Sequence, residues 1–157
     1  MSQARRVADS ALTMSQVVMP ADANHYGYVH GGTIMRLVDE AAFAVATRHT
    51  GMNVVTASVD QMSFEAPVRI GDILTIKASL NYVGRTSMEV GVRVETERLK
   101  TRETLRVGSA YVTMVALDGQ GRPTPAPELT LETDDDRRRN REATERRQRR
   151  LEAAGKA

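Results

Sequence analysis

Hydrophobic positions change their spacing along this chain from a helical period to a strand period. Between about Gly32 and His49 nearly every residue is apolar, and the few polar side chains fall on one narrow stripe. This period predicts one long helix that is buried on most sides, and Gly51 is well placed to end it. The aromatic Phe43 lies within the polar stripe, which indicates that a second subunit covers this face.

Alternating apolar and polar residues predict strands on both sides of that helix. A first strand spans residues 11–19 and ends at Pro20. After the helix, four further strands joined by short turns are expected at residues 54–64, 73–83, 86–97 and 104–117. Short connections favour antiparallel neighbours, so the predicted fold class is α+β, with a mostly antiparallel five-stranded sheet and the helix packed on one face.

Composition divides the chain into a body and a tail. After Pro123, Pro125 and Pro127, residues 134–157 have almost no apolar side chains and carry nine basic and six acidic ones. Residues 1–133 hold 13 basic and 14 acidic residues, so the basic pI of ≈ 9.2 belongs to the tail. We expect one domain over residues 1–133 and a charged, Arg-rich tail over 134–157. This tail would be helical or disordered and would lack an apolar face to pack on the domain.

Several classes of function are excluded or unsupported. The chain has no cysteine, which excludes disulfides, zinc–thiolate sites and thiol catalysis. No apolar run approaches the ~20 residues of a membrane span or forms a signal peptide, so a cytoplasmic location is the default expectation. His25, His30 and His49 follow no metal-ligand spacing, and we expect neither a metal nor a separate cofactor. The near-neutral body gives no support for nucleic-acid binding.

The predicted helix opens with His30, Gly31 and Gly32, and Asp39 follows two turns later in what looks like a buried position. Backbone N–H groups in the first helical turn have no partner within the helix, and the helix dipole adds positive potential there. Two glycines leave these groups uncovered, so an oxygen that becomes negative during a reaction would be stabilised at this place. Such a donor site near a carboxylate suggests acyl chemistry. The glycines could equally serve only to let the helix start pack closely.

Three motifs in register carry a resemblance to a known family and cover about residues 12–117. They are Pro20-x3-Asn24-x2-Gly27-x3-Gly31-Gly32-x2-Met35-x3-Asp39-Glu40, then Val55-Thr56-Ala57-Ser58-Val59-Asp60 followed by Phe64 and Pro67, and Gly84-Arg85-Thr86-Ser87-Met88-Glu89-Val90. With these motifs the chain resembles the hotdog-fold acyl-CoA thioesterases. It is most similar to the acyl-CoA hydrolase branch that includes brain acyl-CoA hydrolase and bacterial single-domain relatives. The resemblance implies a long central helix wrapped by the sheet.

The resemblance also assigns roles to residues of the first motif. In this family the aspartate at the position of Asp39 serves as general base or nucleophile. The asparagine at the position of Asn24 has a catalytic role, holding the attacking water or the thioester oxygen. Gly31 and Gly32 would donate backbone N–H groups to the thioester carbonyl. From the residues alone, Asp39 could simply rim the polar stripe, and Asn24 could be an ordinary turn residue.

Substrate-binding residues are expected at two further places. The resemblance favours contact with coenzyme A at the turn after residue 83, whose donors suit phosphate or pantetheine oxygens but are also common in exposed turns. The residues of this turn are Gly84, Arg85, Thr86 and Ser87. Phe64 is expected either in the core or in the wall of an acyl pocket, and His30 at such a pocket.

The expected function is hydrolysis of fatty acyl-CoA to a free fatty acid and coenzyme A. A non-catalytic acyl-CoA sensor, with the basic tail contacting a partner, is the alternative. A hotdog dehydratase is disfavoured because the histidine–proline motif expected for that chemistry is absent.

The spacing within the helix predicts how the site is assembled. Gly31 and Asp39 are eight residues apart, which is about 12 Å along a helix. A reacting carbonyl must lie about 3 Å from both its oxyanion donors and the attacking group. If both act on one thioester, Asp39 must come from a second subunit. We therefore expect self-association as at least a dimer, and the resemblance implies further assembly as a trimer of dimers.

Overall fold

One long helix wrapped by an antiparallel sheet forms the centre of the molecule. The structure, a computed structural model, describes residues 3–155. The central helix is α2, Gly31–Thr50, and the sheet strands are β2 (Leu12–Val17), β3 (Asn53–Asp60), β4 (Ile73–Val83), β5 (Ser87–Arg98) and β6 (Glu103–Leu117). Their order is β2-β4-β5-β6-β3, and every neighbouring pair is antiparallel. The predicted α+β class, the five strands and the central helix are confirmed.

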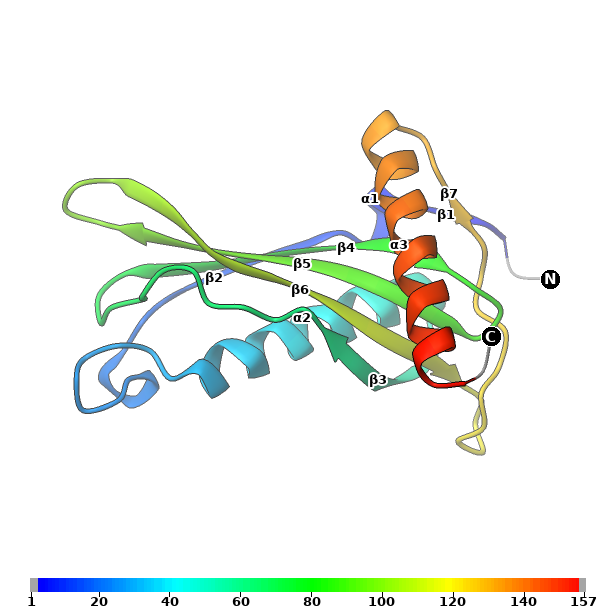
Figure 1. Cartoon of the computed structure of the whole chain (residues 1–157), viewed down its shortest axis with the longest axis horizontal. Coiled ribbons are helices and arrows are strands. Elements are labelled where there is room, and N and C mark those ends of the chain that lie inside the picture. The colour runs from blue at the N-terminus through cyan, green and yellow to red at the C-terminus, as the bar shows by residue number, and fades with distance from the viewer. Residues whose placement is uncertain (1–2, 156–157) are drawn as a thin grey trace.

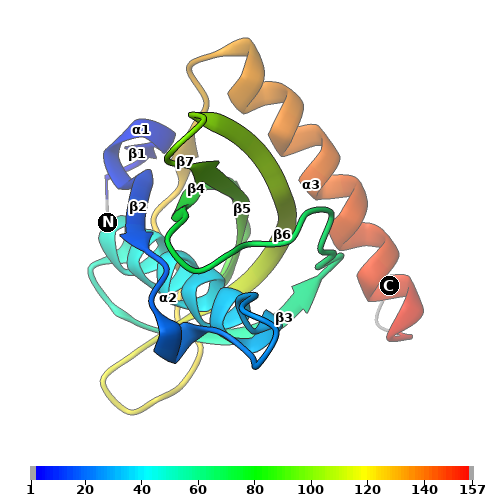
Figure 2. The same ribbon diagram turned by 90° about the vertical axis from the view of Figure 1, so that its left-hand side faces the viewer.

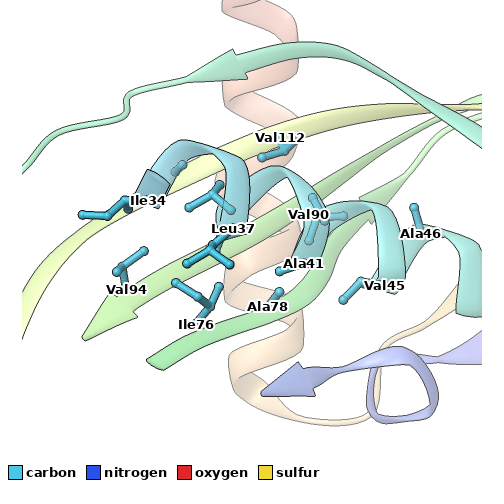
Figure 3. Close-up of a cluster of buried hydrophobic side chains, with 14 of the residues drawn as sticks. Ile34, Leu37, Ala41, Val45, Ala46, Ile76, Ala78, Val90, Val94 and Val112 are labelled. Atoms are coloured by element: carbon cyan, nitrogen blue, oxygen red, sulfur yellow. The ribbon is translucent and has the colours of Figure 1, made fainter. Parts of the chain in front are cut away.

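The core lies between α2 and the inner face of the sheet, which curls around the helix (Figures 1 and 2). Figure 3 shows the aliphatic side chains of α2 facing Ile76, Val90 and Val112 on β4, β5 and β6. Ala41 and Ala46, both fully buried, let the helix backbone approach the strands closely. Burying these apolar side chains is the main source of stability for such an arrangement.

The two ends of α2 are built differently. At its C-terminal end, Gly51 adopts a left-handed conformation (φ 67°) and donates its N–H to the carbonyl of Thr47, as the sequence predicts. At its N-terminal end, His30 occupies the cap position, but its side chain makes no capping hydrogen bond. The first turn of α2 therefore keeps free backbone donors.

Short elements outside the predicted set join the N-terminal segment to the segment that precedes residue 134. β1 (Arg5–Arg6) pairs in parallel with β7 (Leu129–Thr130), and the four-residue helix α1 (Val7–Ser10) follows β1. The 3-10 turn η1 (Pro20–Asp22) lies in the loop before α2. In the part of the chain that the structure describes, no helix has both the length and the apolar character to span a membrane.

Residues 134–157 are expected from the sequence to form a helical or disordered tail without an apolar face for docking; the described part is helical, but the expectation that it stays apart from the domain is wrong. Asp134–Ala153 forms helix α3, which lies across the outer face of the sheet, opposite α2 (Figures 1 and 2). The docking contacts are polar: Arg146 forms a buried ion pair with Glu89 on β5, and Arg150 pairs with Asp60 on β3. A search for an apolar helix face misses such docking, because arginine can be buried when a carboxylate on another strand neutralises it.

Candidate active site

The first turn of α2 presents two uncovered backbone donors. Within residues 3–155 the N–H groups of Gly31 and Gly32 have no hydrogen-bond partner, whereas those of Thr33 and Ile34 bond to the carbonyl of His30. A Cβ at Gly32 would meet no atom within 4 Å, so the space in front of it is open. Together with the positive end of the helix dipole, this turn can stabilise an oxygen that carries negative charge.

Asn24 lies in the loop that leads into α2. Its amide oxygen is used within the loop, whereas its amide nitrogen is not. Its Oδ1 accepts hydrogen bonds from the N–H groups of Tyr26 (2.9 Å) and Tyr28 (3.2 Å), so the loop closes on it. Gly27 supplies the left-handed residue (φ 84°) that this turn requires. In the described chain the Nδ2 group makes no hydrogen bond, which leaves it able to donate to a ligand oxygen.

Asp39 lies two turns along α2 and points toward the edge strand β3. Its Oδ1 accepts a hydrogen bond of 2.5 Å from the hydroxyl of Thr56, which fixes the carboxylate against the sheet. The expectation of a buried Asp39 is wrong for the single chain, in which this residue is exposed. The helical period places Asp39 beside the apolar stripe. However, β3 contacts only one side of the Asp39 side chain, through Thr56. The carboxylate is therefore held in place yet open to water.

Apolar side chains surround Asp39 on the exposed surface of the chain. On α2, Phe43 is 50% exposed and Met35 is 49% exposed. On β3, which forms an edge of the sheet, Val55 and Val59 are also exposed. An unpaired strand edge beside exposed apolar side chains is typical of a surface that another protein covers.

Phe64 is placed beside the start of α2. A Cβ at Gly31 would lie 3.4 Å from the Phe64 ring, which itself is half exposed. The ring therefore forms an apolar wall next to the backbone donors. His30, which directly precedes Gly31 in the chain, is exposed. Of the predicted binding residues, Phe64 and His30 are the two that the fold brings to the helix start.

The predicted coenzyme A turn lies at the opposite end of α2 (Figure 1). It connects β4 to β5 and closes with a hydrogen bond from the N–H of Gly84 to the carbonyl of Ser87. The carbonyl of Thr86 accepts from Ala116, whose β6 position pairs with Val54, just after the helix. One chain therefore does not bring residues 84–87 together with Gly31 and Gly32, since α2 separates them by about 30 Å.

Thr56 contacts the candidate site, although its place in the sequence predicts only a strand residue. It lies in the second motif, whose alternation of apolar and polar residues predicts a strand. A threonine on a strand and an aspartate 17 positions earlier on a helix give no local signal of contact. The register of β3 against β6, together with the packing of α2 on the sheet, decides that their side chains meet.

Metal binding finds no donor set in this region. Within the described residues, His, Asp and Glu side chains do not gather in groups of three or more that could hold a metal ion.

Comparison with known proteins gives consistent results. Residues 26–102 match the model of the thioesterase superfamily. The protein VdlD of Helicobacter pylori is 42% identical over 137 residues, covering 87% of this chain and 78% of VdlD. A hexameric acyl-CoA thioesterase has a solved structure with a TM-score of 0.93 and 35% identity, covering 98% of each chain.

The acyl-CoA hydrolase of Staphylococcus aureus is a further structural neighbour. Its complex with butyryl coenzyme A, coenzyme A and coenzyme A disulfide has a TM-score of 0.86 and 34% identity, covering 96% of this chain and 94% of that one. Three other structures of the same hydrolase carry single alanine substitutions, at an asparagine, an aspartate and a threonine.

Proposed function

This chain belongs to the thioesterase superfamily, and from that premise we propose that it hydrolyses fatty acyl-CoA thioesters to the free acid and coenzyme A. The observation that carries the proposal is the free pair of N–H groups at Gly31 and Gly32, preceded in the chain by the loop that holds Asn24. The three residues substituted in the S. aureus hydrolase follow one another at the same intervals as Asn24, Asp39 and Thr56. This agreement supports a shared set of site residues.

In the proposed reaction the thioester carbonyl binds at the start of α2. The N–H groups of Gly31 and Gly32 polarise it and stabilise the tetrahedral oxyanion. Asp39 takes a proton from water as the water oxygen attacks the carbonyl carbon, and Thr56 holds the carboxylate for this step. The C–S bond then breaks, and coenzyme A leaves as the thiolate, which takes up the proton. Asn24 donates its Nδ2 to the water or to the thioester oxygen.

A variant of this mechanism has Asp39 attack the carbonyl itself and form a mixed anhydride. Water then hydrolyses the anhydride in a second step. A single turnover in water labelled with oxygen-18 distinguishes the two routes. The nucleophilic route places the label first in the Asp39 carboxylate, whereas the general-base route places it directly in the fatty acid.

The active site is proposed to form between two subunits. Gly31 and Asp39 of one chain are about 12 Å apart along α2, too far to act on one carbonyl. The hydrogen bond from Thr56 holds Asp39 toward β3, the edge that exposes Val55 and Val59. Pairing across this edge would bring Asp39 of one subunit toward the helix start of the other and cover Phe43. We propose a dimer as the functional unit, assembled further as a trimer of dimers; two structural neighbours are hexameric, which supports a six-subunit assembly.

The decisive experiment offers the purified protein a panel of acyl-CoAs from short to long chain, with a thiol reagent that detects released coenzyme A. We expect release from at least one chain length, and the panel also gives the chain-length preference. An Asp39→Asn variant purified in the same way controls for contaminating hydrolases. Absence of thiol release above this control for every substrate would overturn the proposed function.

Mixing two inactive variants tests the shared site. Asn24→Ala and Asp39→Asn are each expected to be nearly inactive. Random pairing after subunit exchange makes half of the dimers mixed, and one of the two sites in each mixed dimer keeps both groups. About a quarter of wild-type activity should therefore return. Mass spectrometry confirms the exchange; exchange without recovered activity would rule out a site shared between subunits.

A further inference from the structure

Helix α3 contacts both strands that lead into the 84–87 turn. It crosses the outer face of the sheet from the β4 side toward β3 (Figures 1 and 2). The N-terminal half of α3 meets β4, where Asn140 donates its Nδ2 to the carbonyl of Asn81 at 3.1 Å. The C-terminal half reaches β3, where Arg150 pairs with Asp60 at 2.9 Å. Between these two contacts lie the groups that hold the turn.

On β5, the contact is a buried ion pair two residues beyond the turn. Arg146 donates to the Glu89 carboxylate through Nη2 at 2.7 Å and through Nε at 3.2 Å. The two side chains are 9% and 3% exposed. Asn81 donates to the same carboxylate, and the guanidinium stacks on the Tyr111 ring at 3.6 Å. A charge pair this deeply buried and this fully bonded holds one geometry.

On β4, the contact reaches the turn through an aromatic ring. The Arg147 guanidinium lies over the ring of Tyr82, 5.7 Å from its centre, within the range of a cation–π interaction. The same ring packs on the turn, since a Cβ at Gly84 would lie 3.3 Å from it. Tyr82 and Glu89 are also paired opposite each other across the two strands. Consecutive residues of α3 thus hold the two strands on either side of the turn.

We propose that α3 fixes the 84–87 turn in its binding conformation for coenzyme A, with Arg146 and Arg147 as positioning residues. The inference rests on the proposed function, together with the expectation from the family resemblance that this turn contacts coenzyme A. A turn at the end of two strands must be ordered when it binds a ligand, and ordering it beforehand removes that cost from the binding free energy. Arg146 and Arg147 contact β5 and β4 on the face of the sheet opposite α2 (Figure 2), so we expect them to affect binding and not the chemistry at Asp39.

The test compares variants of the contacts that Arg146 and Arg147 make, here called the clamp, with a matched control on α3. Glu89→Gln/Arg146→Met removes both buried charges together, so neither is left unpaired. Arg147→Gln removes only the cation over Tyr82. Arg141→Gln, which changes an exposed arginine of the same helix, is the control. Circular dichroism and thermal unfolding establish that each variant is folded. Steady-state kinetics with the best acyl-CoA and calorimetric binding of free coenzyme A give KM, kcat and Kd.

We expect the double variant to raise KM and the Kd of coenzyme A together by about tenfold, and Arg147→Gln to raise both by about threefold. In both variants kcat should stay within about twofold of wild type, because the transition-state contacts at α2 are untouched. The control should match wild type. If Arg147→Gln is folded but leaves both KM and Kd unchanged, or if kcat falls instead of affinity, the inference is overturned.

The outcomes separate this inference from the proposed function. Hydrolysis by wild type with unaltered affinity in the clamp variants would overturn the role of α3 and leave the function intact. Binding of coenzyme A that weakens in the variants, without hydrolysis of any substrate, would support α3 as a positioning element and overturn the function. Failure of wild type to bind coenzyme A would overturn both.

Discussion

The two ends of helix α2 handle polar groups in opposite ways. At the N-terminal end, the N–H groups of Gly31 and Gly32 have no partner within residues 3–155, and Asp39 is exposed. Around the C-terminal end, His49 and Glu89 are buried and each has hydrogen-bond partners, although Nδ1 of His49 has none within the described residues. His49 is 1% exposed, with Nε2 2.7 Å from the carbonyl of Pro127, and Glu89 is enclosed by Arg146 and Asn81.

This difference matches the two roles that we propose: the reaction takes place at the N-terminal end of α2, and the binding turn is held in shape at the C-terminal end. Groups that act on a substrate need free donors and acceptors, and leaving them exposed avoids the cost of burying them unpaired. Groups that hold a binding turn in one shape act best when they are fully paired and shielded from water. Substitutions at the N-terminal end should therefore change activity with little effect on folding, whereas those at the C-terminal end should change stability.

The largest expected effect is loss of activity in Asp39→Asn. The amide cannot accept a proton from water, so kcat should fall on the order of 10²–10⁴ fold. The hydrogen bond from Thr56 can still be accepted by the amide oxygen, so the melting temperature should stay close to that of wild type. A thiol-release assay measures kcat, and differential scanning calorimetry measures the melting temperature. A folded variant with wild-type kcat would exclude Asp39 from the reaction.

At the other end, Glu89→Ala should mainly destabilise the chain. It leaves the Arg146 charge buried without its partner, which typically costs about 3–5 kcal/mol of unfolding free energy. The control is Glu40→Ala, which breaks the exposed pair with Arg36 on α2 and should cost about 0.3–0.5 kcal/mol. Urea denaturation measures both. Similar losses in the two variants would show that the Glu89 pair is no more important than a surface pair.

Gly32→Ala sharpens the comparison because it should raise stability and lower activity. Nothing lies within 4 Å of a Cβ at this position, and alanine favours a helix over glycine by about 0.5–1 kcal/mol. The chain should therefore become slightly more stable. The new methyl group would stand beside the oxyanion donors, and kcat/KM should fall by about tenfold. Unchanged kcat/KM would show that the open space in front of Gly32 is not used by substrate.

The smallest expected effect is a pH dependence of stability from His49. Burial, together with the nearby Arg5 charge, lowers the pKa of its imidazole below the ordinary value of 6.5. The unfolded chain then binds a proton at a higher pH than the folded chain does. The free energy of unfolding should therefore fall as pH drops below about 6.5 and be fully present above it, with a slope of at most about 1.4 kcal/mol per pH unit.

His49→Gln provides the matched control for this prediction, because its amide can still donate to the carbonyl of Pro127. Urea denaturation between about pH 5 and pH 8 should show a flatter profile for the variant. The same slope in both proteins would assign the pH dependence to other groups.

Local periodicity was sufficient to predict most elements of this fold. The helical period around Leu37 and Ala41 placed α2 within one residue at each end, and Gly84 marked its turn. Alternation found all five strands, although the strand expected at 54–64 ends at Asp60. Backbone sterics and the side-chain repeat are properties of neighbouring residues, so they can be read along the chain. The same holds for the free donors at Gly31 and Gly32, which follow from a helix that begins at glycine.

The contacts that differ most from expectation all join residues far apart in sequence. Thr56 meets Asp39, and Arg146 meets Glu89, only after the strands adopt their register and α2 and α3 pack on opposite faces of the sheet. The sequence by itself determined the elements and the chemistry available at the start of α2. The tertiary structure alone decided that Asp39 is exposed and that an arginine-rich helix docks. Pairing between distant polar groups depends on strand register and on how the helices pack on the sheet. Neither produces a periodic pattern along the sequence.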